Sequence, residues 1–432
     1  MFTDLINAVI VALLSQVIND SFLRHISCAV MKNLVHTIDV AIIGGGITGI
    51  LSAYLLHKTG KGITILEKNK VNSGATKDTT AFITGVIDTS LRDLIKIFGL
   101  AKAKRVMESH EQAIALIEKI IRKEQIDCGF KRCSNYEYAN SKKELRELEE
   151  ESAAAKKLGL KVSFEKKENP RLGFRHAGYL EFKRQAKFRA GDFVESLASI
   201  LKERGIKIIE KKEATSVSLD KNQVTIMGRD LTVSAQWVII ATHEPFNKPL
   251  GLYFKKAFYT TYVIEAALPR GVVPEAIYED VENPYHYFRI DHKDKNTDTL
   301  MLGGEDHRSD IPVKAAKNFN SLKKYLCGLL PDTPYTLISK WQGPILESVD
   351  GLPYIGPIGV KRILYAMAFS GNGMTYSAIA ALIFRDHILK KKNAWANVYR
   401  ANRIPSIRAL ILKGRDYTGE LIHGALKNTF IK

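Results

Sequence analysis

Cysteine is scarce in this chain. Four cysteines occur among 432 residues, namely Cys28, Cys128, Cys133 and Cys327. A disulfide framework or a metal site needs closely spaced cysteines or histidines, and no such partners lie beside Cys128 and Cys133. The scarcity therefore excludes a small disulfide-rich secreted domain. We expect no metal site and a reducing compartment, which indicates a cytoplasmic protein.

Long hydrophobic runs are also absent. The apolar run at residues 6–14 is much shorter than the about 20 residues that a membrane-spanning helix needs. The chain begins Met-Phe-Thr-Asp, which lacks the basic start of a secretory signal. Met31 looks like a natural start shortly before the first predicted strand. We therefore interpret residues 1–30 as a doubtful N-terminal extension without a catalytic role.

Acidic residues are fewer than basic residues. The sequence has 46 Asp and Glu against 64 Lys and Arg, a formal net charge of +18. A field of this sign attracts nucleic acid, anionic lipid or an acidic partner. The basic residues are spread along the whole chain, however, without a block interleaved with aromatic residues. A general basic bias is the favoured explanation, and no nucleic-acid partner is predicted.

The most informative feature that is present is a run of glycines near the start. An apolar strand-like run at residues 39–43 is followed by Gly44, Gly46 and Gly49, after which residues 50–57 have the pattern of a helix. In a Gly-x-Gly-x-x-Gly motif the first glycine allows a tight turn and the second lets the backbone approach a pyrophosphate. The third lets the helix pack closely on the strand.

The segment after this helix completes the pattern. A second apolar strand at residues 62–66 ends in Glu67, which lies 23 residues after Gly44. A carboxylate at this spacing can accept the hydroxyls of an adenosine ribose, and the start of the helix offers free N–H groups to phosphates. The context predicts a dinucleotide site. The alternative is a glycine turn in some other βαβ unit.

A second strand, glycine turn and helix lie near the end of the chain. They occupy residues 363–369, 370–375 and 376–389, so segments typical of nucleotide binding stand at both ends. A β-rich block at residues 251–340 lies between them and is predicted to form an antiparallel sheet. Further predicted elements are two helices within 90–126, a charged helix at 142–158, a helix at 193–204, a hairpin at 224–227 and 231–233, and a buried strand at 237–242.

A series of landmarks in this order resembles one known family. The landmarks are the glycine motif with Glu67, then residues 73–81, 126–130, 238–246, 303–307, 341–343, 350–356 and 370–375. Together they resemble the FAD-dependent oxidoreductases of the D-amino-acid oxidase, glycine oxidase and sarcosine oxidase superfamily, over about residues 39–400. The resemblance is strongest to the branch in which many members carry a C-terminal Rieske iron–sulfur domain.

The resemblance implies an α/β fold. It would comprise a Rossmann-like FAD-binding domain of the glutathione-reductase type with an inserted antiparallel β-rich substrate domain. The expected division is residues 31–130, 181–250 and 341–400 for the FAD-binding domain, residues 131–180 and 251–340 for the substrate domain, and residues 401–432 for an amphipathic tail.

The resemblance also implies which residues bind the cofactor. Noncovalent FAD is expected, because residues 370–375 offer no Cys or His for a covalent link. The ADP half of FAD would lie on Gly44, Gly46, Gly49 and Glu67, with Ala214 near the adenine. The expected contacts along the pyrophosphate and the flavin are Thr76, Thr79, Thr80, Ala81, Gly371, Asn372, Gly373 and Met374.

Three departures from the family pattern bear on the substrate. The Arg-Pro pair that anchors a substrate carboxylate in amino-acid oxidases is missing from residues 341–350. The His-Pro pair that often follows Gln-Ala is replaced, since Gln185 and Ala186 are followed by Lys187, Phe188 and then Arg189. The Rieske domain is absent, because no Cys-x-His set occurs after residue 350.

Candidate residues for the chemistry come from the β-rich block. Tyr287 and Arg289 are expected to face the flavin, and His307 follows a glycine pair. Arg289 could replace the missing carboxylate anchor, and the alternative is a strand arginine paired with Glu305 or Asp306. His307 could act in catalysis, and the alternative is that it has a structural role.

The tail at residues 401–432 has apolar residues at helical spacing and a net charge of +4. It could rest on a membrane surface or an electron-acceptor protein. A helix packed on its own domain is favoured, because three glycines weaken it as an isolated helix.

We expect an oxidoreductase that oxidises a small amine or amino-acid-like substrate and passes electrons to O₂ or another acceptor. The alternatives are an electron-transfer flavoprotein with a separate Rieske or quinone-linked partner, or a dinucleotide-binding protein without turnover.

Overall fold

The glycine-rich segment forms a strand, a turn and a helix in the predicted order. In the computed structural model, which describes residues 38–220, 222–247, 256–409 and 412, strand β1 (Ile38–Ile43) leads into helix α2 (Ile47–His57). Strand β2 (Ile63–Leu66) follows and pairs with β1 in parallel. The first ten residues of α2 are buried, because apolar and small residues occupy all of its sides. The predicted βαβ unit is confirmed.

These strands belong to an eight-stranded sheet whose main path is β16-β17-β10-β1-β2-β7. Its other strands are β7 (Lys207–Ile209), β8 (Ala214–Asp220), β9 (Gln223–Gly228), β10 (Leu231–Ile240), β16 (Tyr354–Ile358) and β17 (Val360–Met367). β1 pairs in parallel with β10, and β10 pairs in parallel with β17. The central strands of this sheet therefore come from the beginning, the middle and the end of the chain.

Strand β10 differs from the sequence prediction. The hairpin strand at 231–233 and the buried strand at 237–242 were predicted separately, but they form one strand. Residues 231–235 pair with β9 in an antiparallel hairpin, and residues 237–240 pair in parallel with β1. The intervening Ser-Ala-Gln contains no glycine or proline that would end a strand, so the chain stays extended from one pairing to the next.

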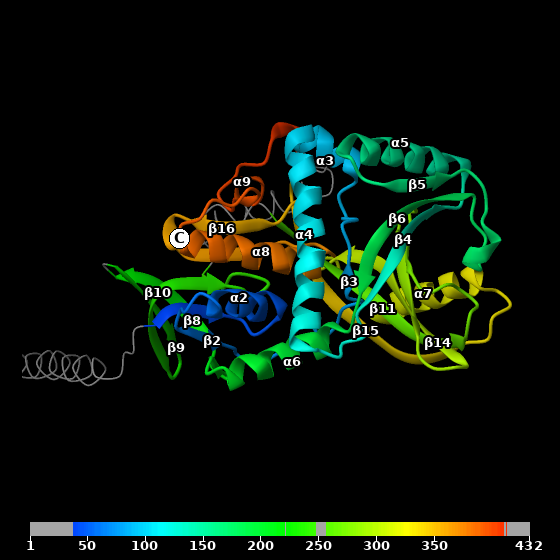
Figure 1. The fold of residues 1–432 in the computed structure, drawn as a ribbon. Coiled ribbons are helices and arrows are strands. Elements are labelled where there is room, and N and C mark those ends of the chain that lie inside the picture. Colours follow the sequence, from blue (N-terminus) through cyan, green and yellow to red (C-terminus); the bar gives the residue numbers. More distant parts are fainter. Residues whose placement is uncertain (1–37, 221, 248–255, 410–411, 413–432) are drawn as a thin grey trace, which may run out of the picture.

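The eight-stranded sheet is covered on both faces. Alternate residues of β1 point to opposite sides, so that Val40 and Ile42 pack with the helices while Ala41 and Ile43 pack toward β8 and β9. Helices α2, α6 (Ala190–Glu203) and α8 (Gly373–Ile388) form the helical layer (Figure 1). Helix α4 (Leu100–Glu124), preceded by α3 (Leu91–Phe98), packs on α8 between the two halves of the molecule (Figure 1).

The second half of the molecule is built on a nine-stranded sheet with the main order β15-β11-β14-β13-β12-β4-β6-β3, and β5 pairs with β6. Its strands are β3 (Phe82–Ile83), β4 (Lys131–Ala139), β5 (Val162–Glu165), β6 (Gly178–Lys187), β11 (Lys256–Pro269), β12 (Ile277–Asp280), β13 (His286–His292), β14 (Thr297–Arg308) and β15 (Thr336–Ser348). The pairs are antiparallel as predicted, except that β12 and β4 are parallel. β3, much of β6 and the end of β15 fall in segments predicted for the other domain, so this sheet crosses the predicted boundaries.

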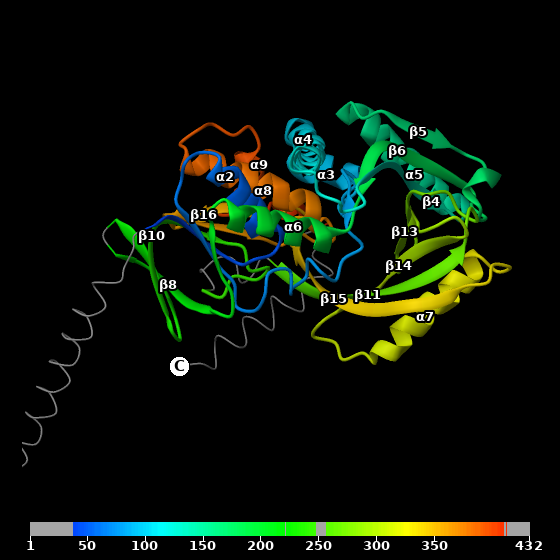
Figure 2. The same cartoon turned by 60° about the horizontal axis from the view of Figure 1, so that its bottom comes forward.

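The two faces of the nine-stranded sheet have different chemical character. Helix α7 (Ala315–Leu329) covers one face, where Tyr262 and Ile264 of β11 join an apolar cluster with residues of α7 (Figure 2). The alternate residues Thr261 and Val263 therefore point to the other face, toward the eight-stranded sheet. This second face carries the polar side chains that matter below.

The remaining elements lie at the edges of these two sheets. Helix α5 (Lys142–Leu158) confirms the predicted charged helix, and α9 (Ala396–Tyr399) and a 3₁₀ turn (Pro170–Leu172) complete the described elements. The predicted extension at 1–30 and most of the tail at 401–432 lie outside the described residues. Within the described ranges, no helix has both the length and the apolar character needed to cross a membrane.

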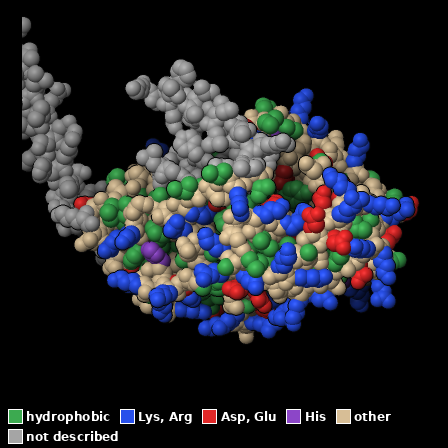
Figure 3. All heavy atoms as spheres, turned by 90° about the horizontal axis from the view of Figure 1, so that it is seen from above, with side chains coloured by type: hydrophobic (Ala, Val, Ile, Leu, Met, Phe, Trp, Pro, Cys, Tyr) green, Lys and Arg blue, Asp and Glu red, His purple; other side chains and the backbone are tan. Residues whose placement is uncertain are grey.

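Basic side chains are distributed rather than concentrated on the face seen in Figure 3. Lys and Arg side chains are scattered over both halves and lie among acidic and apolar side chains. This distribution on the visible face agrees with the spread of basic residues along the sequence.

Candidate active site

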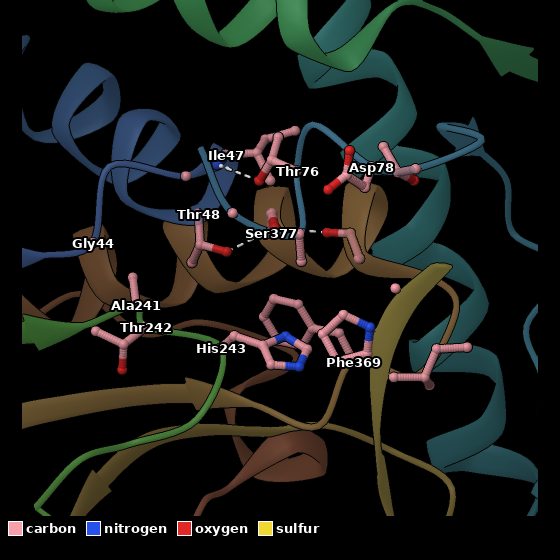
Figure 4. Close-up of a pocket in the computed structure, with 18 of the residues that line it drawn as sticks. Gly44, Ile47, Thr48, Thr76, Asp78, Ala241, Thr242, His243, Phe369 and Ser377 are labelled. Atoms are coloured by element: carbon pink, nitrogen blue, oxygen red, sulfur yellow. Dashed lines mark hydrogen bonds between the residues drawn. The ribbon is translucent and has the colours of Figure 1, made fainter. Parts of the chain in front are cut away.

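A cavity of about 380 Å³ is lined by residues from both sheets (Figure 4). One part of its lining comes from the turn between β1 and α2, the end of β2 and the loop at residues 72–80. Another part comes from β11, β12, β13 and β15, and the segment at 366–374 before and into α8 completes it. A ligand in this cavity therefore contacts both halves of the molecule.

The glycine turn is possible only without side chains. Gly44 has φ of +115°, and a Cβ atom on it would lie 2.4 Å from the carbonyl oxygen of Ala241. A Cβ atom on Gly49 would lie 2.0 Å from the carbonyl oxygen of Gly44. The turn thus depends on the first and third glycines of the motif, and Gly46 between them lines the cavity.

The N-terminus of α2 opens into this cavity. Its N-cap residue Gly46 provides no side-chain hydrogen bond, and the first turn contains no acidic residue. The N–H of Ile47 donates to Thr76 Oγ1 at 3.2 Å, and Thr48 and Ser377 share a hydrogen bond of 2.8 Å between their hydroxyls (Figure 4). A helix start with this composition favours an anionic group such as a phosphate.

Glu67 stands at the end of β2 and lines the cavity. Its carboxylate accepts hydrogen bonds from the N–H of Gly45 at 2.7 Å and from the N–H of Asn69 at 2.8 Å. These two donors fix the carboxylate beside the glycine turn. Lys68, Lys212 and Ala214 line the same part of the cavity, so a negatively charged nucleotide meets basic side chains there.

The loop after Ser73 is held by an internal hydrogen bond and by Arg289. Ala81 has φ of +53°, and its N–H donates to Thr79 Oγ1 at 3.0 Å. The guanidinium of Arg289 donates to the carbonyl oxygens of Thr80 and, at 2.9 Å, of Phe188. Thr76, Thr79 and Thr80 line the cavity while Ala81 lies behind them.

Arg289 is placed differently from the sequence expectation. Its side chain is 3% exposed, pairs with Asp291 at 2.9 Å and does not line the cavity. Burial lowers the pKa of the guanidinium, although the Asp291 carboxylate counteracts part of this effect. The expected role as a carboxylate anchor loses its geometric basis, because these protein partners occupy the guanidinium. The alternative pairing with Glu305 or Asp306 is also not observed, since the acid is Asp291.

His307 does not reach the cavity either. Its ring stacks on Tyr262 with a centroid distance of 5.7 Å, and its Nδ1 atom is buried without a hydrogen-bond partner. Tyr262 belongs to the apolar cluster under α7, so His307 lies beside the covered face of the sheet. This contact agrees with the structural alternative for His307.

Tyr287 does line the cavity. Its hydroxyl lies 3.2 Å from Thr261 Oγ1, and its ring packs edge-on against Phe82. The ring of Tyr287 lies over Gly303 of the neighbouring strand β14, and a Cβ atom added to Gly303 would lie 2.3 Å from the ring. Tyr285 stacks beside Tyr287 with a centroid distance of 5.8 Å. The two tyrosines form an aromatic wall, and burial raises the pKa of both so that their hydroxyls stay protonated.

The helix start at α8 is tied to a neighbouring loop. Asn372 accepts from the N–H of Asp88 at 3.1 Å and donates to the carbonyl of Val86 at 3.0 Å. The N–H of Gly371 donates to Asp88 Oδ2 at 2.7 Å. Gly371, Asn372, Gly373 and Met374 all line the cavity, where the sequence placed the edge of the flavin.

Five carboxylates in the cavity lining were missed by the sequence analysis. They are Asp78, Asp88, Glu213, Glu244 and Glu279, and Glu279 is the one that comes from the nine-stranded sheet. Burial, then the charge of Asp88, raises the pKa of Glu279 to about 8. Burial also raises the pKa of Asp306 to about 6, although Tyr285 donates a hydrogen bond to its carboxylate.

Most of the predicted residues are thus brought together around one cavity. Those that line it are Gly44, Gly46, Glu67, Thr76, Thr79, Thr80, Ala214, Tyr287, Gly371, Asn372, Gly373 and Met374. Gly49, Ala81, Arg289 and His307 lie outside the lining. His243 also lines the cavity, with φ of +64° (Figure 4).

The chain is similar to several known proteins. It is 28% identical over 397 residues to YhfW of Bacillus subtilis (strain 168), a protein named as a Rieske 2Fe-2S iron-sulfur protein, over 90% of this chain and 76% of the relative. It is 22% identical over 386 residues to gamma-glutamylputrescine oxidoreductase of Escherichia coli (strain K12), over 84% of this chain and 87% of the relative.

The fold is that of a solved structure. The crystal structure of glycine oxidase from Geobacillus kaustophilus superposes with a TM-score of 0.72 at 20% identity, covering 86% of this chain and all of that one. Residues 39–386, well over half of the chain, match the sequence family described as FAD dependent oxidoreductase. A cavity with a glycine turn, an uncapped helix start and a carboxylate at one end suits that cofactor. The chain therefore belongs to the family of FAD-dependent oxidoreductases.

Proposed function

We propose that this protein holds FAD along the cavity and oxidises a small amine at a carbon–nitrogen bond. The observation that carries the proposal is the division of the cavity lining. Backbone donors, Glu67 and two lysines suit the ADP half of the cofactor, whereas Glu279 and the aromatic side chains beside it on the nine-stranded sheet suit a small cationic molecule. Such a molecule would lie between the sheet and the segment that begins α8.

Residues of both halves have definable roles in this proposal. The Glu67 carboxylate would accept hydrogen bonds from the ribose hydroxyls, and the start of α2 together with Thr76 would hold the pyrophosphate. The segment at 371–374 would lie along the flavin edge. FAD, when bound, takes up the two electrons and the hydrogen that the substrate carbon loses. With loss of a proton from its nitrogen the substrate becomes an imine, which water hydrolyses to a carbonyl compound and either ammonia, from a primary amine, or a smaller amine, from a secondary amine.

The sheet side orients the substrate and excludes water. Tyr285 and Tyr287 provide flat apolar surfaces, and their protonated hydroxyls can donate or accept hydrogen bonds. Phe82 and Ile345 add apolar area to the same lining. A neutral amine nitrogen held beside such a wall needs no strong general base, because loss of hydride from its α-carbon is assisted by the nitrogen lone pair.

Named relatives support a substrate of this class. Gamma-glutamylputrescine oxidoreductase and glycine oxidase carry an amine and an amino acid in their names, and both match this chain over most of its length. A primary or secondary amine is common to both substrates. For this chain we therefore propose a primary or secondary amine as the substrate. Oxygen or another acceptor would then take the electrons from the reduced flavin.

The experiment is an anaerobic titration of the purified holoprotein with a panel of amines and amino acids. Loss of the visible absorbance of oxidised flavin on adding an amine, and its return on adding air, supports the proposal. An unchanged spectrum with every amine in the panel contradicts it.

A second candidate function rests on the relative YhfW. That protein is named for a Rieske iron–sulfur group, and its match with this chain covers 76% of its length, so a Rieske protein is a candidate electron-transfer partner. If this is the function, the flavin is reduced or reoxidised by such a protein and not by amines or air. Mixing the holoprotein with a purified Rieske protein under anaerobic conditions separates the two candidates.

A cytoplasmic location is part of the proposal. The three described cysteines are free thiols, which suits a reducing compartment. Fractionation of cells followed by detection of the protein in the soluble or membrane fraction tests it.

A further inference from the structure

Glu279 occupies a defined place on the open face of the nine-stranded sheet. Its strand β12 lies between β4 and β13, and the residues opposite it are Glu137 and Tyr287. Because side chains alternate along a strand, Tyr278 joins the apolar cluster under α7 while Glu279 points to the other face. Glu279 therefore lies beside the aromatic wall, in the lining of the cavity.

The charged groups around Glu279 are predominantly acidic. Asp88 from the loop before α3 and Glu137 from β4 are its acidic neighbours, and Asp280 follows it on its own strand. Arg92 lies near Glu137 but pairs with Glu150 and Glu151. Asn135 and Tyr287 face Glu279 as neutral groups. Burial next to these charges makes the ionised form of Glu279 costly until a cation arrives, which agrees with its raised pKa.

Among the residues that the structure describes, the cavity lining holds no guanidinium that could receive a substrate carboxylate. Its lysines, Lys68 and Lys212, belong to the part with Glu67 and Ala214, and Arg289 is occupied by Asp291 and backbone carbonyls. A carboxylate beside the aromatic wall would meet Glu279 and Asp88 as like charges. An ammonium group in the same place would meet opposite charges.

We propose that Glu279 is a specificity-determining residue and that the substrate is a diamine or polyamine whose second, unreacted ammonium group binds this carboxylate. The inference rests on the proposed amine oxidation and adds the charge class of the substrate. The reacting nitrogen lies at the flavin edge near residues 371–374, and the remote ammonium lies on the sheet. Amino acids are disfavoured because their carboxylate has no cationic partner there within the described part of the chain.

The proposal has a proton-linkage consequence. Below a pH of about 8 the carboxyl of Glu279 is largely protonated, so binding an ammonium group releases a proton. Below pH about 8, the apparent affinity for a dication then rises with pH, by up to about tenfold per pH unit. Above this pH the affinity levels off, because Glu279 is already ionised. Replacing Glu279 by glutamine removes this dependence.

The test uses a short bis-quaternary ammonium ion, which has no lone pair and cannot be oxidised as an amine. Its dissociation constant is measured by titration calorimetry on the holoprotein, in two buffers of different ionisation enthalpy to count released protons. For Glu279→Gln we expect affinity at least about tenfold weaker, with proton release lost, because one charge-assisted contact is removed. Flavin content and absorbance confirm that the variant is folded.

Glu265→Gln is the matched control. Glu265 lies on β11, two residues from Val263 and on the same face, but it does not line the cavity and accepts a hydrogen bond from Ser339. It is expected to bind the dication like the parent protein. Equal affinity in Glu279→Gln and the parent protein overturns the proposal, as does tighter binding of a monocarboxylate than of the dication.

The outcomes separate this inference from the proposed function. If no amine bleaches the flavin but the dication binds through Glu279, amine oxidation is refuted and the cation site stands. If amines bleach the flavin but Glu279→Gln leaves the ratio of diamine to monoamine KM unchanged, amine oxidation stands and the role of Glu279 is refuted.

Discussion

Replacing Arg289 by lysine tests whether this buried arginine supports the fold or the substrate. The guanidinium reaches Thr80, Phe188 and Asp291 at once, and its side chain is 3% exposed. A lysine ammonium at the end of a flexible stem cannot serve three partners in this planar arrangement. We assume that two charge-assisted contacts are lost and one remains. Each such contact contributes roughly 1.5–3 kcal/mol, and new hydrogen bonds to water offset part of the loss. We therefore expect the free energy of unfolding to fall by about 2–4 kcal/mol.

The assay is denaturant unfolding of Arg289→Lys with measurement of FAD affinity. Because Arg289 holds the carbonyl of Thr80, and Thr79 and Thr80 line the cavity, FAD binding should weaken together with stability. Arg308→Lys is the control, because that arginine pairs with Asp310 near the surface and should change stability by less than about 1 kcal/mol. A variant with unchanged stability and FAD affinity but a raised KM for acidic substrates would refute this reasoning and restore the anchoring role.

Three further predictions concern the cofactor and the aromatic wall. Acid precipitation of the holoprotein should release all of the yellow colour into the supernatant, because residues 370–375 contain no Cys or His for a covalent link; colour in the pellet contradicts noncovalent binding. Glu67→Ala should weaken FAD binding by about 1.5–3 kcal/mol in reconstitution of the apoprotein, since ribose hydroxyls lose a charged acceptor; unchanged affinity would show that another group binds the ribose. Gly303→Ala should raise the KM for amines while flavin content stays near that of the parent protein, because the new Cβ atom lies 2.3 Å from the ring of Tyr287 and must displace it; an unchanged KM would mean that the ring position does not matter for binding.

The cofactor half of the site could be predicted because its signals are local. The turn at Gly44, the helix start after Gly46 and the carboxylate of Glu67 lie within one short βαβ unit, where backbone geometry alone fixes their relative positions. The same holds for the glycine turn before α8, which is another strand, turn and helix. In both segments the residue type and the spacing carry the information.

The substrate half could be predicted less well because strand register and bulges determine it. Tyr287 and Arg289 are two residues apart and lie on the same face of the sheet, as the alternation of side chains predicts. Only Tyr287 lines the cavity, because Arg289 lies under the loop at residues 80–81. His307 follows an irregularity in the pairing of β11 with β14, and Glu305 just before it has φ of +56°. A bulge of this kind changes which face a side chain takes, and the sequence gives no clear sign of it.

The hydrogen bond between Thr48 and Ser377 has a consequence for biosynthesis. It joins two helix starts whose residues are 329 positions apart, and the intervening strand β10 is paired on one side with β1 and on the other with β17. A nascent chain that still lacks β17 and α8 has neither the last parallel strand nor the residues at the start of α8 that line the cavity. Until β17 has been synthesised, the edge of β10 that it pairs with has no partner strand, and an unpaired strand edge of this kind favours aggregation.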